Sequence, residues 1–105
     1  MSSETIVSTS RPVCLVGGAS ATNADISNVL QLVAGFVAVD SGADALLRAG
    51  IAPIAVVGDL DSLSQTARDT FANLLCQIDE QSTTDFEKAL TRVAAPAIIA
   101  LGFTG

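Results

Sequence analysis

The order of apolar and polar residues along the chain predicts short strands that alternate with helices. Apolar runs of strand length predict buried strands at residues 13–16, 36–39, 54–57, 76–78 and 97–101. Between these runs, apolar residues recur at the spacing of one helix face and predict helices at residues 23–34, 41–49, 65–75 and 84–92. The first of these helices has a predicted apolar face made of Ile26, Val29, Leu30 and Val33.

Helices are expected to begin at side chains that can accept a hydrogen bond from a free backbone N–H group. Residues 41–44 (SGAD) have the S-x-x-D form of a capping box, and residues 84–87 (TDFE) are a second candidate. Residues 23–25 (NAD) can begin the first helix, and either Ser62 or Ser64 can cap the third. These signals agree with the helices that the apolar spacing predicts.

Regular alternation of strand and helix is typical of α/β proteins with a parallel sheet. Crossovers between parallel strands are nearly always right-handed, and the helices within these crossovers cover the sheet. We therefore expect one three-layer, Rossmann-like domain over residues 12–105, with helices on both faces of the sheet. Residues 1–11 are rich in Ser and Thr and are expected to form a disordered or extended leader.

Composition agrees with an α/β domain and disfavours several kinds of partner. The formal net charge of −6 argues against a nucleic-acid-binding surface, which would show clustered Lys and Arg. No apolar run approaches the ~20 residues needed to span a bilayer, and the first residues lack the apolar core of a secretory signal. We therefore expect a cytoplasmic protein that does not bind membranes, with Cys14 and Cys76 as reduced, buried thiols.

Carboxylates lie at the ends of the predicted strands. Asp40 ends the second strand, Asp59 and Asp61 follow the third, and Asp85 lies at the start of the last helix. Because the carboxyl ends of parallel strands share the edge at which α/β sheets bind ligands, these acids are expected to converge. The chain has no His, and paired carboxylates suit Mg²⁺ together with phosphate oxygens. The pattern therefore favours a Mg²⁺ site for a phosphorylated ligand.

Each of these residues also has a structural interpretation. Asp is common in turns and at helix starts, and Asp85 with Lys88 could be a first-turn acid and an ordinary surface ion pair. Residues 17–18 (GG) after a strand are a weak phosphate-loop signal when they stand alone. A D-x-D after an apolar strand also occurs in aspartyl-phosphate hydrolases and glycosyltransferases. The first would need a matching downstream Lys and acidic pair, and the second a much longer chain.

Three stretches carry more specific patterns, namely residues 38–43 (AVDSGA), 54–62 (IAVVGDLDS) and 84–90 (TDFEKAL). They resemble the motifs A-x-D-G-G-A, P-x-x-x-x-G-D-x-D-S and T-D-x-x-K-A-L of the thiamine pyrophosphokinase family, in the same order and at similar spacing. Ser41 stands where this family usually has Gly, and Asp44 where it often has Asn. The likeness runs from about Val13 to the last residue.

The resemblance implies transfer of a pyrophosphoryl group from ATP to thiamine, which gives thiamine diphosphate and AMP. It implies that Asp59, Asp61 and Asp85 hold Mg²⁺, that Lys88 neutralises phosphate charge, and that Asp40 lines the same crevice. The other nucleotide-binding positions that it implies are Ser41, Gly42, Ser62, Gln81 and Thr84. A negative crevice would also suit a cationic thiazolium substrate once the metal is bound.

The same family continues after the last strand into a β-rich domain that contributes to the thiamine site, and its active unit is a homodimer. We therefore expect the chain to be the N-terminal, nucleotide-binding portion of such an enzyme, truncated at its C-terminal end. On its own it should bind Mg–nucleotide weakly and should not turn over thiamine. Two alternatives stay open: a related pyrophosphokinase that acts on a hydroxymethyl pterin, and a non-catalytic Mg–nucleotide-binding module.

Overall fold

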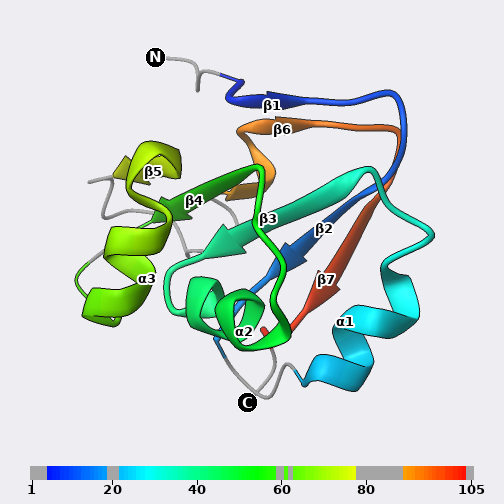
Figure 1. Ribbon diagram of the computed structural model, residues 1–105. Helices are drawn as coiled ribbons and strands as arrows, with labels where there is room; N and C mark the ends of the chain where they lie inside the picture. Colours follow the sequence, from blue (N-terminus) through cyan, green and yellow to red (C-terminus); the bar gives the residue numbers. More distant parts are fainter. Residues whose placement is uncertain (1–4, 19–21, 59–60, 62, 78–88, 104–105) are drawn as a thin grey trace.

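The computed structural model describes residues 5–18, 22–58, 61, 63–77 and 89–103. Its centre is a five-stranded parallel sheet with the strand order β5-β4-β3-β2-β7 (Figure 1). The strands span Val13–Val16 (β2), Gly35–Val39 (β3), Ala55–Gly58 (β4), Leu75–Gln77 (β5) and Ile98–Leu101 (β7). The predicted α/β fold with a parallel sheet is confirmed.

Three helices connect consecutive strands on one side of this sheet. They span Asn23–Val29 (α1), Gly42–Ala49 (α2) and Gln65–Thr70 (α3), and a 3₁₀ turn at Ala72–Leu74 (η2) leads from α3 into β5. From β2 to β5, each strand is added on the same side of the one before it. Right-handed crossovers therefore place all three helices on the same face of the sheet. Strand β7 is added on the other side of β2, and the described part of the connection that leads to it, residues 89–97, packs on the opposite face.

Alternate residues of each strand pack into two different clusters, as expected for a sheet that is covered on both faces. The cluster under the helices joins strand residues to α1, α2 and α3 and includes Cys14, Val16, Ile26, Phe36, Ala38, Leu46, Val56, Ala67 and Phe71. The cluster on the opposite face includes Val7, Val13, Leu15, Val37, Val39, Ala55, Val57 and Ala89. Ala89 is in helical conformation and fully buried there, which agrees with the reversed last crossover.

The segment that was expected to be a disordered or extended leader contains a strand. Val7–Ser8 (β1) pairs in parallel with Val93–Ala94 (β6) to form a separate two-stranded sheet, drawn beside the main sheet in Figure 1. Val7 is only 3% exposed because it packs into the cluster on the face of the sheet opposite α1, α2 and α3. Disorder is therefore the wrong prediction for this part of the segment, although it is extended.

The first helix is shorter than its apolar spacing predicts. Its N-cap is Thr22, whose hydroxyl accepts from the Asp25 N–H while the Asp25 carboxylate accepts from the Thr22 N–H. The helix ends at Val29, and Leu30, which was expected on the apolar face, is 47% exposed. Val33 is buried as expected, but it reaches the core from the turn that follows the helix.

Other boundaries also differ from the predicted ones. The helix expected over residues 65–75 ends at Thr70, because the chain turns at Phe71 and Leu75 already belongs to β5. Ile54, the expected first residue of the third strand, lies before β4 and is 39% exposed. Of the helix expected over residues 84–92, residues 84–88 lie outside the described part, and 91–92 form a turn.

The two cysteines are free thiols in different surroundings. Cys14 lies in the middle of the sheet and is fully buried, and this burial raises the pKa of its thiol from 9.0 to about 12. Cys76, in the edge strand β5, is half-buried, so the prediction of two buried thiols holds for Cys14 alone. Among the helices of the described residues, none is both long enough and apolar enough to cross a membrane.

Candidate functional site

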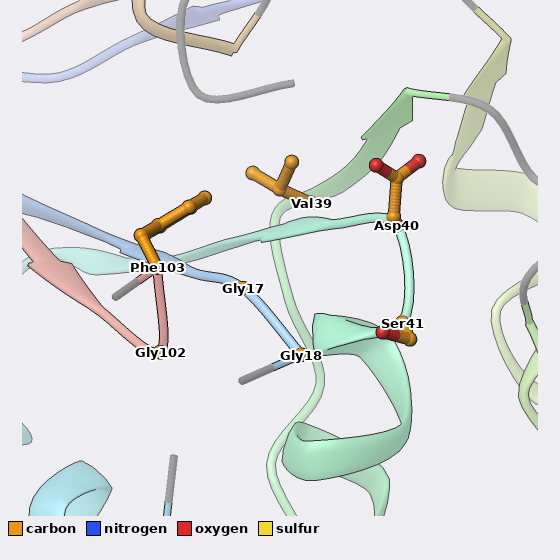
Figure 2. A pocket seen from close by; sticks show the side chains of 7 residues that line it. All are labelled: Gly17, Gly18, Val39, Asp40, Ser41, Gly102 and Phe103. Carbon is orange, nitrogen blue, oxygen red and sulfur yellow. The ribbon is translucent and has the colours of Figure 1, made fainter. Parts of the chain in front are cut away.

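The strand order creates a switch point beside β2. The chain adds β3, β4 and β5 on one side of β2 and then returns to add β7 on the other side. The direction in which strands are added therefore reverses at β2, and such a switch point is where open α/β sheets bind ligands. A pocket of about 390 Å³ lies at this point, lined by Gly17, Gly18, Val39, Asp40, Ser41, Gly102 and Phe103 (Figure 2).

Glycine backbone forms one side of this pocket because there is no room for side chains. The Gly17 N–H donates to the Leu101 carbonyl at 2.8 Å, which extends the pairing of β2 with β7 beyond both strands. A Cβ on Gly17 would lie 2.7 Å from the Gly102 carbonyl oxygen and 3.0 Å from the Phe103 ring. A Cβ on Gly18 would collide with the Ser41 hydroxyl. Glycine is therefore required at both positions by the packing of the chain itself, and the exposed Gly18 presents its main chain to the pocket.

Asp40 stands at the edge of the pocket in an unusual backbone conformation. Its φ of +51° is the only positive φ among the described non-glycine residues, and Asp is one of the residues that tolerate it. Its N–H donates to the Val57 carbonyl at 2.9 Å, and its carbonyl accepts from the Ala43 N–H at 3.2 Å. The backbone therefore turns abruptly from β3 into α2 while it stays tied to β4.

The carboxylate of Asp40 packs against the end of the neighbouring strand. Its Oδ1 atom is buried and lies where a Cβ on Gly58 would have to go, and Gly58 has a φ of +114°. Figure 2 shows the side chains of Val39, Asp40 and Phe103 on one side of the Gly17–Gly18 segment. The pocket thus combines an apolar wall, one fixed carboxylate and exposed main-chain groups.

The start of α2 is packed directly onto β2. Gly42 is buried, and a Cβ there would overlap the Val16 carbonyl group, so the helix begins in backbone contact with the sheet. Ser41 occupies the N-cap position but has helical φ and ψ, and its side chain makes no capping hydrogen bond. The capping box predicted for residues 41–44 is therefore wrong. Instead, the Ser41 side chain lies against Gly18 and lines the pocket.

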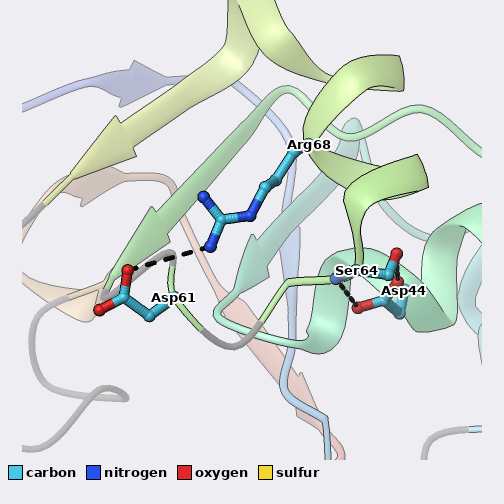
Figure 3. A network of polar contacts seen from close by, with 4 residues as sticks. All are labelled: Asp44, Asp61, Ser64 and Arg68. Carbon is cyan, nitrogen blue, oxygen red and sulfur yellow. Dashed lines mark hydrogen bonds and ion pairs between the residues drawn. The ribbon is translucent and has the colours of Figure 1, made fainter.

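Asp44, the other half of the expected capping box, reaches a different helix. Its carboxylate accepts from the Ser64 N–H at 3.2 Å and from the Ser64 hydroxyl (Figure 3). The same hydroxyl accepts from the Ala67 N–H at 3.1 Å and so caps α3, as predicted for Ser64. The first turn of α2 is thereby joined to the first turn of α3.

Asp61 forms an ion pair with a residue of α3. The Arg68 guanidinium lies 3.9 Å from its Oδ1 atom, as drawn in Figure 3. The Asp61 side chain is 91% exposed and that of Arg68 is 37% exposed, so solvent screens the pair and its contribution to stability is about 0–1 kcal/mol. The Asp61 carboxylate is therefore accessible to a competing cation.

Comparison with known proteins shows which family the chain belongs to. The family model described as thiamin pyrophosphokinase, catalytic domain, matches residues 26–105, which include Asp40, Asp61 and the β7 side of the pocket. The chain belongs to the thiamin pyrophosphokinase catalytic-domain family. No curated protein matches the chain.

Solved structures of thiamin pyrophosphokinases have the same fold over the matched part. The enzyme from Geobacillus thermodenitrificans superposes with a TM-score of 0.69 at 28% identity, over 90% of this chain and 47% of that one. The enzyme from Candida albicans superposes with a TM-score of 0.66 at 21% identity, over 83% of this chain and 34% of that one. The chain thus spans less than half the length of these thiamin pyrophosphokinases.

The structure describes some of the predicted thiamin pyrophosphokinase site residues. Asp40 and Ser41 line the pocket, and Gly42 lies directly beneath it at the start of α2. Asp61 is not among the lining residues and faces Arg68 instead. The remaining predicted residues lie outside the described part: Asp59, Ser62, Gln81, Thr84, Asp85 and Lys88. Among the described residues no group of three or more potential metal-ligating side chains occurs.

Several residues of the pocket were not singled out from the sequence. Val39, Gly102 and Phe103 line it, and the Gly17–Gly18 pair is only a weak signal in the sequence. The feature that identifies them is the strand order, because β7 must lie next to β2 before Phe103 can face Gly17. In the thiamin pyrophosphokinase fold, the pocket residues therefore come from three strand ends that are far apart in the sequence.

Proposed function

We propose that this chain supplies the ATP- and Mg²⁺-binding part of a thiamin pyrophosphokinase, which transfers pyrophosphate from ATP to thiamine and releases AMP. The observation that carries the proposal is the pocket at the switch point of the sheet, which is lined by glycine main chain on one side and has the Asp40 carboxylate at its edge. Membership of the family and the names of the solved relatives support the choice of substrates.

The proposed reaction exchanges one phosphorus–oxygen bond for another. The hydroxyl oxygen of thiamine bonds to the β-phosphorus of ATP, and the bond from that phosphorus to the α–β bridging oxygen breaks. AMP leaves with the bridging oxygen, and the hydroxyl proton passes to solvent or to a nearby carboxylate. Such transfers depend on in-line positioning and charge neutralisation rather than on a covalent intermediate, so a chain without His can carry them out.

The described residues suit the binding of a nucleotide. The main chain of Gly18, exposed beyond the end of β2, can meet phosphate or ribose oxygens in the pocket. Val39 and Phe103 form an apolar wall against which a flat ring can pack. The Ser41 hydroxyl can donate to the ligand, and the Asp40 carboxylate can accept hydrogen bonds from hydroxyl groups.

The donor set fits Mg²⁺ rather than a softer metal. The acids offer hard oxygen ligands, and the exposed Asp61 carboxylate is accessible to a cation. The formal charge of −6 would also repel a polyphosphate unless a cation lay between them. In the proposal Asp59, Asp61 and Asp85 hold the ion, with Lys88, Ser62, Gln81 and Thr84 near the phosphates. The bound ion would neutralise phosphate charge and orient the chain of phosphates.

The nucleotide part of the proposal is tested by binding to the 105-residue chain. Calorimetric titration with ATP should show binding with Mg²⁺ and at least tenfold weaker binding with EDTA, as expected when carboxylates face phosphates. The variant Gly18→Val, whose Cβ would displace the Ser41 hydroxyl that lines the pocket, should lose binding. Equal affinity with and without Mg²⁺ would contradict the proposed metal site.

The acceptor is tested by AMP release from ATP and Mg²⁺ in the presence of thiamine, of a hydroxymethyl pterin, or of neither. For the full-length gene product we expect AMP only with thiamine. Release of AMP only with the pterin would support the proposed ATP site and show that the acceptor is the pterin and not thiamine. Nucleotide binding without AMP under any condition would favour a non-catalytic Mg–nucleotide-binding module. For the 105-residue chain alone we expect binding without turnover of thiamine.

A further inference from the structure

Asp44 makes contacts that its own helix does not need. It lies in the first turn of α2, half-buried, where an acid already favours the helix through the macrodipole. Yet its carboxylate accepts hydrogen bonds from both the N–H and the hydroxyl of Ser64, which is twenty residues further along the chain. The Ser64 hydroxyl in turn accepts a hydrogen bond from the Ala67 N–H at 3.1 Å. We refer to these hydrogen bonds between Asp44, Ser64 and Ala67 as the clamp.

The clamp fixes one end of the segment that joins β4 to α3. At the β4 end, Gly58 is buried and packs against Asp40. At the α3 end, Leu63 is 6% exposed within the core cluster, and Ser64 is held by the clamp. Asp59 and Asp61, the acids that the proposed function assigns to Mg²⁺, occur in the sequence between these two fixed ends.

We propose that Asp44 is a positioning residue for the Mg²⁺ site, because its clamp holds the α3 end of the segment that carries Asp59 and Asp61. The inference rests on the proposed function, and it assigns to Asp44 no contact with the ion or the nucleotide. A carboxylate suits this role because it presents two acceptor oxygens to the two donors of Ser64. An amide at this position would keep one acceptor oxygen and replace the other with a donor.

The test compares Asp44→Ala and Asp44→Asn with a matched control, Asp69→Ala. Asp69 lies in α3, is exposed, and accepts a hydrogen bond from the Gln65 side chain at 2.9 Å. Its replacement therefore removes the same charge and an α3 side-chain hydrogen bond, but it leaves the clamp intact. Mg²⁺ affinity is measured by calorimetric titration of each variant saturated with α,β-methylene-ATP. The clamp is followed separately by amide hydrogen exchange at residues 63–67 without metal.

We expect Asp44→Ala to weaken Mg²⁺ binding about tenfold, the lower end of the loss seen for groups that orient metal ligands. Exchange at residues 63–67 should become faster by about tenfold, as for loss of a hydrogen bond to a charged group. Asp44→Asn should fall between Asp44→Ala and the wild type in both measurements, and Asp69→Ala should match the wild type in both. Ser64→Ala added to Asp44→Ala should weaken Mg²⁺ binding little further, since both remove the same clamp.

Three results would overturn the proposal in different ways. Faster exchange in Asp44→Ala with unchanged Mg²⁺ affinity would make the clamp a purely structural feature. Equal Mg²⁺ affinities for Asp44→Ala, Asp44→Asn and Asp69→Ala, all below the wild type, would show that charge alone matters. Failure of the wild-type chain itself to bind Mg²⁺ with the nucleotide would reject the proposed function, and the positioning role with it.

Discussion

The close approach of α2 to β2 leads to a prediction for Gly42. In this first residue of α2, a Cβ would overlap the carbonyl oxygen of Val16 and lie 2.6 Å from its carbonyl carbon. It would also lie 3.2 Å from the carbonyl carbon of Gly17. All of these neighbours are main-chain atoms of the inner strand β2 and its turn, so they cannot move aside as a flexible side chain would. The helix as a whole would have to shift.

Two opposing terms set the size of the effect of Gly42→Ala. Alanine favours a helix interior over glycine by up to about 1 kcal/mol, and by less in the first turn. Overpacking a buried site costs about 1–3 kcal/mol, and contact with main chain places this site at the upper end. We therefore expect the free energy of unfolding to fall by about 2 kcal/mol. For a domain of this size that corresponds to a melting temperature lower by roughly 10 °C.

The measurement is urea unfolding followed by circular dichroism, with Gly50 as the contrasting position. Gly50 ends α2 with a φ of +74°, and a Cβ added to it would meet no atom within 4 Å. At Gly50 the backbone conformation, and not space, therefore disfavours alanine. Asparagine should be tolerated better than alanine at Gly50 and worse than alanine at Gly42. An unchanged or higher urea midpoint for Gly42→Ala would refute the argument from close approach.

Three further predictions concern residues outside α2. Because burial raises the Cys14 pKa to about 12, the folded chain keeps a proton that the unfolded chain releases near pH 9, so stability should fall as the pH rises through this range. The free energy of unfolding should drop by up to about 1.4 kcal/mol per pH unit there. The variant Cys14→Ala should lack this dependence on pH, and an equal slope in the wild type and the variant would contradict the prediction. Asp61→Asn should change the free energy of unfolding by less than about 0.5 kcal/mol in thermal melts, since its ion pair is exposed, but should abolish Mg²⁺-dependent nucleotide binding in the calorimetric titration. Val7→Ala should lower the free energy of unfolding in urea by about 1–2 kcal/mol if β1 packs as described, whereas a disordered leader would leave it unchanged.

The inner strands β2, β3 and β4 could be predicted from the sequence because they are buried on both faces. All four residues of β2 are buried, so the strand appears in the sequence as an unbroken apolar run. The same signal fails at the ends of elements. Phe71, Leu74 and Leu75 have helical spacing, but they pack against the core from a turn, a 3₁₀ segment and a strand. Spacing alone cannot separate these cases, since each of them places apolar side chains toward the same cluster.

The strand β1 could not have been predicted from its own pattern. It has only two residues, and the burial of Val7 depends on pairing with Val93, which is remote in the sequence. The pocket has the same limitation. Asp40 could be proposed from the sequence because any acid at the end of a parallel strand lies at the ligand-binding edge. Phe103 could not, because nothing local shows that β7 lies next to β2.

The described carboxylates at this edge differ in how firmly they are held, and this difference separates positioning from binding. Asp44 accepts two hydrogen bonds from Ser64, so a cation that took its oxygens would have to break both. The ion pair of Asp61 with Arg68, at 3.9 Å, is screened by solvent, so the loss of that contact would cost little. In the sequence, Asp61 belongs to the D-x-D pattern and Asp44 to an S-x-x-D pattern that forms no capping box in the structure. The hydrogen bonds of Asp44 support its role in the clamp, and the proposed function keeps Asp61 as a ligand of the ion.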